Sequence, residues 1–169
     1  ILAESLGMDI YYYDIEKKLS LGNAKPMCSL EELLRISDVV TLHVPSTELT
    51  RNMISERQIE QMKKGACLIN ASRGDVVDYK ALAQGLRTFH LAGAAADVFP
   101  REPVDGNEPF ENELQEFNNV ILTPHIGGST MEAQANIAIE VAEKLVKYSD
   151  TGSTIGAVNF VEISLQPNI

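Results

Sequence analysis

The sequence predicts an α/β fold organised around a doubly wound parallel sheet. Short apolar runs of strand type alternate along the chain with stretches of helical periodicity. Three helical stretches open with a serine followed three residues later by Glu or Gln, which is the capping-box signature. Polar residues directly follow several of the apolar runs. Because such sheets bind ligands at the carboxyl ends of their strands, these residues predict a binding site along one rim.

The elements can be placed along the chain by these signals. Residues 1–7 have the pattern of the last turns of an amphipathic helix closed by a glycine, so we expect this helix to begin upstream. The apolar runs predict strands over residues 8–13, 38–44, 66–70, 91–98 and 120–122. The capping residues and the periodicity predict helices over residues 29–36, 55–62, 78–88 and 130–148.

Some segments carry more specific expectations. The strand at 38–44 is apolar enough for burial on both faces, as in a parallel sheet, and Pro45 should end it. The acidic stretch up to Glu116 is expected to be a solvated loop. Ser129 should cap the last helix, which has one broad apolar face. Residues 158–169 are expected to form a tail with one short strand.

Composition excludes several function classes. The chain has 169 residues, 44% of them hydrophobic, which suits a folded domain with a sizeable core. Its net charge is −10 and its basic residues do not cluster, which argues against a nucleic-acid or anionic-membrane partner. No apolar run approaches the roughly 20 residues that a membrane span needs. Two cysteines without CxxC spacing indicate reduced thiols and a cytoplasmic protein.

Asp14 follows the first predicted strand. A carboxylate at the end of the second strand of a dinucleotide-binding unit accepts hydrogen bonds from the adenosine ribose, which favours NAD over NADP. The glycine fingerprint that should precede it would lie mostly before residue 1. The alternative interpretation is an aspartate that only stabilises a turn.

Arg73 and Glu102 are candidates for contact with a substrate. Arg73 stands beside a glycine after the strand at 66–70, where its guanidinium could hold a carboxylate with two parallel hydrogen bonds. The alternative is a surface arginine paired with Asp75 or Asp78. Glu102 lies between two prolines that restrict the backbone, so its carboxylate is expected to be held in place.

His125 is the candidate group for proton transfer. It follows the strand at 120–122 and precedes two glycines and a helix, so it should be held at the rim of the sheet. A histidine that only caps the strand-to-helix turn is the alternative. His43 could likewise approach a ligand or be a core or rim residue. The three histidines lack metal-site spacing, so no metal is expected.

Five motifs resemble those of the D-isomer-specific 2-hydroxyacid dehydrogenases. They are Tyr13-Asp14-Ile15-Glu16, the segment Ser37 to Pro45, Leu68-Ile69-Asn70-Ala71-Ser72-Arg73-Gly74, Ala96 to Pro103, and Leu122 to Thr130. The resemblance spans nearly the whole chain. It implies a Rossmann-like NAD-binding domain over residues 1–148 and a segment, 149–169, that returns to the side of the substrate domain.

The resemblance also implies roles for individual residues. Arg73 would bind the substrate carboxylate and polarise its carbonyl, His125 would be the acid–base, and Glu102 would be its partner. Hydride transfer at C2 must be accompanied by proton transfer at the substrate oxygen, and a carboxylate beside an imidazole favours the charged form. The implied NAD-binding residues are Asp14, His43, Pro45, Ala71, Ser72, Arg73, Asp97, His125, Ile126, Gly127 and Gly128.

The resemblance finally implies what surrounds this chain. The first strand of the family's sheet would precede residue 1 and lie mid-sheet, so the sheet should be interrupted and the chain alone inactive. The expected substrate is 3-phospho-D-glycerate, with glycerate or lactate as alternatives, and the expected assembly is a homo-oligomer, a dimer or tetramer. A second interpretation is a non-enzymatic, NAD-sensing protein similar to the corepressors of the same fold.

Overall fold

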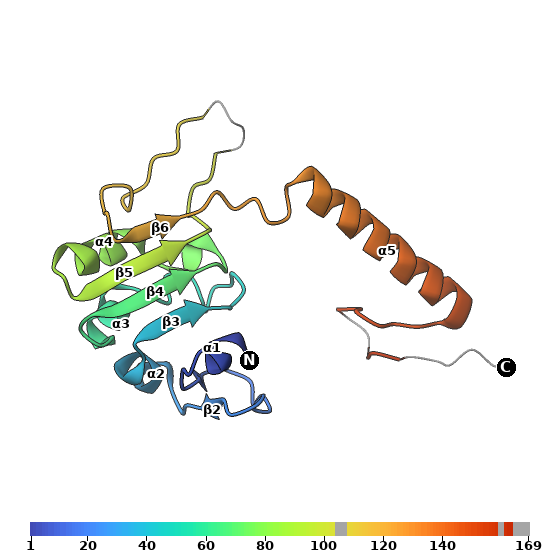
Figure 1. Cartoon of the computed structure of the whole chain (residues 1–169), viewed down its shortest axis with the longest axis horizontal. Coiled ribbons are helices and arrows are strands. Elements are labelled where there is room, and N and C mark those ends of the chain that lie inside the picture. Colours follow the sequence, from blue (N-terminus) through green and yellow to red (C-terminus); the bar gives the residue numbers. More distant parts are fainter. Residues whose placement is uncertain (104–107, 159–160, 164–169) are drawn as a thin grey trace. The chain divides into compact units, whose positions relative to one another are not determined.

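The computed structural model describes residues 1–103, 108–158 and 161–163. The chain divides into two compact units, residues 1–124 and residues 125–169. The first unit contains parallel strands joined by helices, so the predicted fold class is confirmed (Figure 1). The proposed functional division at residues 148 and 149 stays a prediction.

All predicted strands and helices of the first unit are present, and most are shorter than predicted. They are α1 (Leu2–Ser5), β1 (Tyr11–Tyr12), α2 (Leu30–Ile36), β3 (Val39–Leu42), α3 (Glu56–Gln61), β4 (Ala66–Asn70), α4 (Tyr79–Arg87), β5 (Leu91–Ala96) and β6 (Val120–Leu122). A short 3-10 helix, η1 (Gly74–Val76), follows β4. Strand β2 (Lys25–Pro26) was not predicted, because it lacks apolar alternation and ends in proline.

The strands form two separate sheets. Strands β3, β4, β5 and β6 lie side by side in that order, and every pair is parallel. Strand β1 pairs in parallel with β2 only. The predicted interruption of the sheet is therefore confirmed, and all four carboxyl ends of the larger sheet lie along one rim.

One face of the four-stranded sheet is buried and the other is open. Helices α2, α3 and α4 cover the face on which Val40, Leu42 and Leu68 are buried (Figure 1). On the opposite face Val39 is 46% exposed and Ile121 is 66% exposed. The prediction that the strand at 38–44 is buried on both faces is therefore wrong, because its side chains alternate between a covered and an open face.

The predicted caps hold for the helices of this unit. The Ser29 hydroxyl accepts the amide of Glu32 at the start of α2, and Gln58 Oε1 accepts from both the amide and the hydroxyl of Ser55 at the start of α3. The Asp78 carboxylate accepts two amides of the first turn of α4. These bonds satisfy amides that the helices themselves leave unpaired.

The acidic stretch before β6 is anchored to the core. Most of its described residues are exposed, as predicted, but Leu114 is fully buried. The ring of Phe110 packs edge-on against Phe99, with centroids 4.7 Å apart. This stretch is therefore held at two apolar points and is not solvated throughout.

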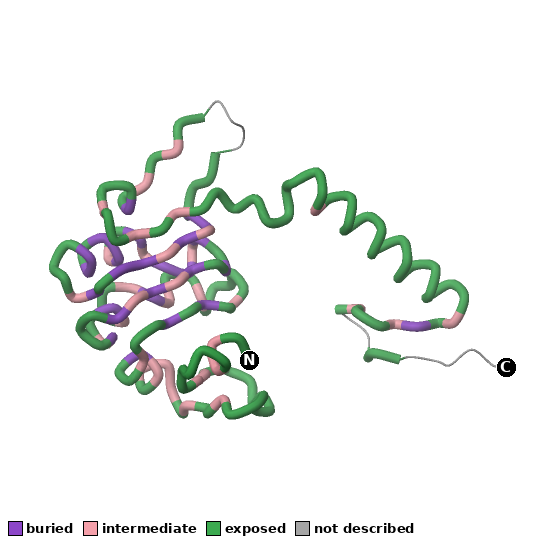
Figure 2. Tube along the Cα trace, viewed as in Figure 1, coloured by how far each residue is buried: buried purple, intermediate pink, exposed green. Residues whose placement is uncertain are grey.

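The second unit contains one long helix, α5 (Met131–Thr151). It begins one residue later than predicted, because Thr130 and not Ser129 caps its first turn. It continues to Gly152, whose φ of 68° is the left-handed conformation that ends helices. No residue of α5 is buried (Figure 2).

The predicted short strand in the tail is tested only in part. Residues 161–163 form no strand, and the other residues of the predicted tail strand, apart from Val158, lie outside the described ranges. No helix in the described ranges is both long and apolar enough to cross a membrane.

Candidate active site

The loops that follow successive strands of the larger sheet are joined by hydrogen bonds. The Ser46 hydroxyl, after β3, donates to the Asp75 carboxylate, after β4. The Asp97 amide, after β5, donates to the Asn70 carbonyl at the end of β4 over 3.0 Å. The Thr123 hydroxyl, after β6, donates to the Asp97 carboxylate. The rim predicted from the sequence is thus one connected surface within the first unit.

Arg73 lies in the loop between β4 and η1, where its side chain is exposed. Its Nη1 donates to the carbonyl of Ser72 over 2.6 Å. The alternative pairing of Arg73 with Asp75 or Asp78 is not observed among the described residues, where Asp75 accepts from Ser46 and Asp78 caps α4. The guanidinium therefore lies at the rim in a position to meet an anion from solvent.

Glu102 lies in the loop after β5, and its side chain curls back towards the strand end. Its Oε1 accepts the backbone amide of Phe99 over 2.9 Å. A Cβ built at Gly74 would lie 2.0 Å from the carbonyl carbon of Phe99, so only glycine allows this approach. The loop that carries Arg73 and the loop that carries Glu102 are therefore in direct backbone contact.

The predicted cofactor residues of this rim differ in how far they are exposed. Ala71 is exposed and Asp97 is half-buried, whereas Ser72 is buried with its hydroxyl on the side chain of Asn70. His43 and Pro45 are exposed after β3, and the His43 ring contacts the Thr41 hydroxyl at 3.1 Å. His43 is thus a rim histidine and not a core one.

Asp14 follows β1 and is exposed. Its Oδ1 accepts the amide of Glu16 over 2.9 Å, so the turn role considered from the sequence is present. Lys18 pairs with Glu16, and the pKa of Lys18 is raised by that hydrogen bond, by the charge of Glu16 and by the charge of Asp14. A single turn bond is compatible with ribose binding, because a carboxylate accepts several hydrogen bonds.

His125 opens the second unit, and its backbone φ is 51°. Few residues other than glycine adopt this conformation, although histidine does so more often than most. A Cβ built at Gly127 or at Gly128 would meet no atom within 4 Å, so packing does not require glycine at these two positions. Unusual backbone angles are often found at functional sites, which favours a functional role for His125.

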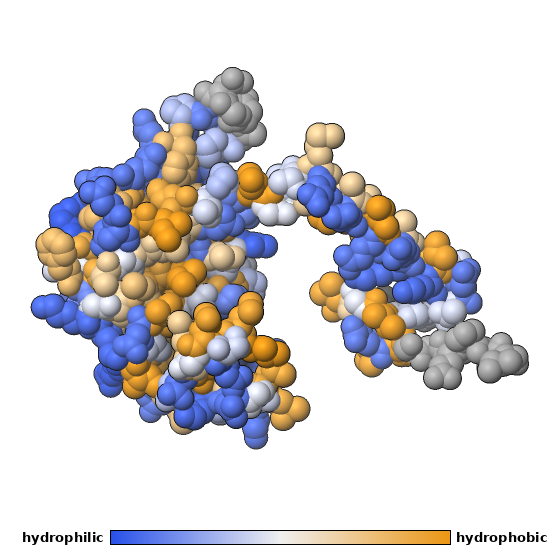
Figure 3. Space-filling view, viewed as in Figure 1, coloured by the Kyte–Doolittle hydropathy of each residue, from blue (hydrophilic) through white to orange (hydrophobic). Residues whose placement is uncertain are grey.

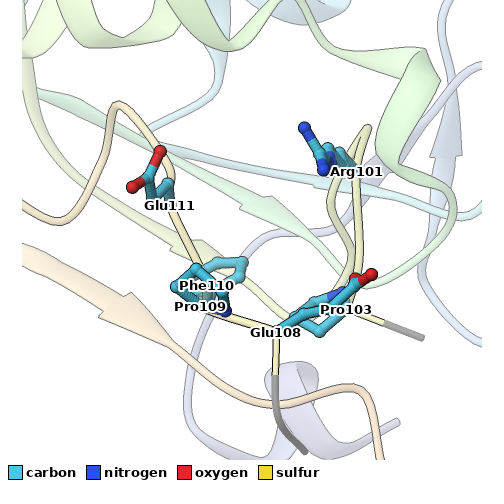
Figure 4. Close-up of a pocket in the computed structure, with 6 residues that line it drawn as sticks. All are labelled: Arg101, Pro103, Glu108, Pro109, Phe110 and Glu111. Atoms are coloured by element: carbon cyan, nitrogen blue, oxygen red, sulfur yellow. The ribbon is translucent and has the colours of Figure 1, made fainter. Parts of the chain in front are cut away.

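Two pockets of the structure adjoin the loop after β5 that carries Glu102. One of about 400 Å³ lies between two arms of the loop after β5, lined by Arg101, Pro103 and the segment from Glu108 to Glu111 (Figure 4). None of the predicted catalytic or cofactor residues lines it. No group of three metal-ligating side chains occurs in the described ranges.

Two residues of the rim escaped the sequence reasoning. The sequence placed Asn70 only at the end of a strand and Tyr79 only in a helix. In the structure the Asn70 amide donates to the Tyr79 hydroxyl and to the Arg73 carbonyl, and the Tyr79 hydroxyl donates to the Val98 carbonyl. A polar amide that ends an otherwise apolar strand was the available signal for Asn70. Nothing in the sequence distinguished the Tyr79 hydroxyl.

Comparison with known proteins identifies the family to which these residues belong. A family model described as "D-isomer specific 2-hydroxyacid dehydrogenase, NAD binding domain" matches residues 1–127. The chain is 62% identical to D-3-phosphoglycerate dehydrogenase of Escherichia coli (strain K12) and 64% identical to that of Haemophilus influenzae, over 165 residues each. Both alignments cover 98% of this chain and 40% of the relative, so the chain spans well under half of their length.

A solved structure of a dehydrogenase is also similar to this chain. D-lactate dehydrogenase from Aquifex aeolicus, in complex with NAD and lactic acid, matches with a TM-score of 0.71 and 34% identity. The match covers 86% of this chain and 48% of that protein.

Proposed function

We propose, since this chain belongs to the D-isomer-specific 2-hydroxyacid dehydrogenase family, that its protein oxidises 3-phospho-D-glycerate to 3-phosphohydroxypyruvate. This would be the first step of L-serine biosynthesis. The observation that carries the choice of substrate is the identity of 62% over 165 residues to a D-3-phosphoglycerate dehydrogenase. Glycerate or lactate are the alternative substrates.

The rim residues suit NAD in charge and in space. The Asp97 carboxylate, held by Thr123, can accept from the nicotinamide amide, and the Asp14 carboxylate can accept from the adenosine ribose hydroxyls. Ala71 is exposed after β4 and brings no bulky side chain to the rim, and His43 and Pro45 are exposed after β3 on the same rim. The turn from His125 to Gly128 would complete the cofactor site.

The proposed chemistry assigns one task to each polar side chain. Arg73 binds the substrate carboxylate through its guanidinium fork and so orients C2. His125, as the neutral imidazole, accepts the proton of the C2 hydroxyl while the carbonyl forms, and Glu102 stabilises the resulting imidazolium. NAD, when bound at the rim, would supply the acceptor for the hydride of C2. In the reverse direction the imidazolium returns the proton.

The setting of the protein is part of the same proposal. We infer a cytoplasmic homo-oligomer whose partners are small molecules and not nucleic acid or membrane, in line with a net charge of −10. The relatives reported above are named as dehydrogenases, which favours an enzyme over an NAD-sensing interaction protein.

The test is NAD reduction by the full-length protein that carries this sequence. The value of kcat/KM for 3-phospho-D-glycerate should exceed the values for glycerate and lactate. His125→Ala should lower kcat by about 10² to 10⁴-fold, the usual contribution of a general acid–base. Arg73→Lys should raise KM for the hydroxyacid more than KM for NAD, because lysine keeps the charge and loses the bidentate grip.

Arg51→Lys is the matched control, since Arg51 is an exposed arginine paired with Glu48 on the surface. It should leave all the constants unchanged. Normal turnover by the His125→Ala protein would refute the mechanism, and a preference for lactate or glycerate would refute the substrate.

A further inference from the structure

Asn70 is a buried amide at the end of an apolar strand. It is the last residue of β4, and only 2% of its surface is exposed. Burying an amide costs free energy unless its polar atoms are hydrogen-bonded. An asparagine at this position therefore needs partners, and these partners indicate what the residue does.

Both polar atoms of the Asn70 side chain are used. Oδ1 accepts from the Ser72 amide over 3.1 Å and from the Ser72 hydroxyl over 2.9 Å. Nδ2 donates to the Arg73 carbonyl over 3.0 Å and lies 3.4 Å from the Tyr79 hydroxyl. The backbone amide needs an acceptor and the backbone carbonyl needs a donor, so these partners fix the orientation of the side-chain amide.

We propose that Asn70 is a positioning residue for Arg73, because its side chain holds the backbone on both sides of the Ser72–Arg73 peptide. This inference rests on the proposed function, in which Arg73 binds the substrate carboxylate. A shift of the Arg73 backbone would move the guanidinium, and a misplacement of about 1 Å can cost about 100-fold in rate.

The same network extends to the loop of Glu102. The Tyr79 hydroxyl donates to the carbonyl of Val98, and the amide of Phe99 donates to Glu102. Burial raises the pKa of Tyr79 to about 12, the hydrogen bond from Asn70 opposes this, and the negative charge of Glu102 adds to it. Tyr79 therefore stays neutral and remains a donor near neutral pH. Asn70 and Tyr79 together link the Arg73 loop to the Glu102 loop.

The experiment compares Asn70→Ala with Tyr79→Phe in the full-length protein. Asn70→Ala should lower kcat/KM for the hydroxyacid by about 100-fold and raise the dissociation constant of NAD by a smaller factor, because it releases the Ser72–Arg73 segment but leaves the Asp97 amide bound to the Asn70 backbone. Tyr79→Phe keeps the ring but removes two hydrogen bonds, the one from Asn70 and the one to the Val98 carbonyl, and should lower kcat/KM about tenfold. Tyr148→Phe, an exposed tyrosine on α5, is the matched control and should change nothing.

A second readout does not depend on catalysis. Hydrogen exchange resolved to single residues should be about tenfold faster at the Ser72 amide in Asn70→Ala, whereas the Asp97 amide should keep its protection. If the unaltered protein oxidises no 2-hydroxyacid, the proposed function fails, and exchange at Ser72 still decides whether Asn70 holds this loop.

Two results would overturn the positioning role. One is an unchanged kcat/KM per folded molecule with only a lower unfolding temperature, which would mean that Asn70 is purely structural. The other is unchanged exchange at Ser72. Should Asn70→Ala fail to fold, an unchanged kcat/KM in Tyr79→Phe would reject the link between the two loops.

Discussion

Helices α4 and α5 differ in what stabilises them. Helix α4 has nine residues and buries five of them, Tyr79, Leu82, Ala83, Gly85 and Leu86. Helix α5 has 21 residues and buries none. Because isolated helices shorter than about 12 to 15 residues are marginal in water, α4 depends on its packing, whereas α5 relies on its length, its caps and its side-chain pairs.

The same difference applies to the candidate site residues that lie near each helix. The packed start of α4 supplies Tyr79, whose hydroxyl is hydrogen-bonded to Asn70 next to the Arg73 loop. The segment before α5 supplies His125. Apolar side chains remain exposed along α5, as its surface shows in Figure 3. The rim of the first unit is therefore fixed by tertiary packing, whereas the backbone of His125 in the second unit is set by a local turn.

Removal of matched leucines should show the largest effect. Leu82 in α4 is 2% exposed and Leu145 in α5 is 62% exposed. Leu82→Ala should lower the free energy of unfolding by about 3 kcal/mol, because it leaves a cavity in the core. Leu145→Ala should change it by less than about 0.5 kcal/mol. Urea unfolding of the two variants measures both values, and equal losses would contradict the comparison.

Alkaline pH should weaken the region around α4 through Tyr79. Its pKa rises from 10.0 to about 12 on folding, chiefly because it is buried. The unfolded chain therefore loses this proton first, so stability that is present below about pH 10 is lost as the pH rises towards about 12. Two pKa units correspond to about 2 to 3 kcal/mol.

Urea midpoints between about pH 9 and about pH 11.5 would measure this loss. Tyr79→Phe should flatten the pH dependence, whereas Tyr148→Phe on α5 should leave it unchanged. The groups that face the Tyr79 hydroxyl are Asn70, the Val98 carbonyl and, at longer range, Glu102. An equally steep decline in Tyr79→Phe would assign the effect to another group.

The elements of α4 and α5 were both predictable, but their surroundings were not. Capping residues and apolar periodicity act within a few residues, so the sequence predicted the helices and the strand ends that carry Arg73, Asp97 and Glu102. The cap of α5 was misplaced by one residue because Ser129 and Thr130 are both good caps. The family resemblance, and not local pattern, supplied the roles of these residues.

What the sequence did not predict depends on neighbours distant along the chain. The Asn70 and Tyr79 bonds join residues 70, 79 and 98, and no local pattern encodes that meeting. The open face of the sheet was missed because the apolar residues at 39, 40 and 42 looked like a strand buried on both faces, although polar Thr41 lies on the same face as Val39. The sequence placed Gly74 only in the loop after the strand at 66–70, and its close approach to Phe99 was visible only in the structure.

The smallest effect should appear in α5 at acid pH. Glu140 and Lys144 form a pair one turn apart, and the pKa of Glu140 is lowered from 4.5 by the hydrogen bond and the charge of Lys144. A depressed pKa stabilises the helix above the unfolded value, and the benefit is lost as the pH falls through the folded value. Helical content measured by far-UV circular dichroism should therefore fall slightly more on acidification in the unaltered chain than in Glu140→Gln.

Glu143→Gln is the control for this last prediction, because it removes a carboxylate from the same helix and leaves the Glu140–Lys144 pair intact. It should keep the acid-dependent loss of helix. Both partners of the pair are largely exposed, so the effect should weaken further with added salt. An equal acid-dependent loss of helix in Glu140→Gln and in the unaltered chain would contradict this prediction.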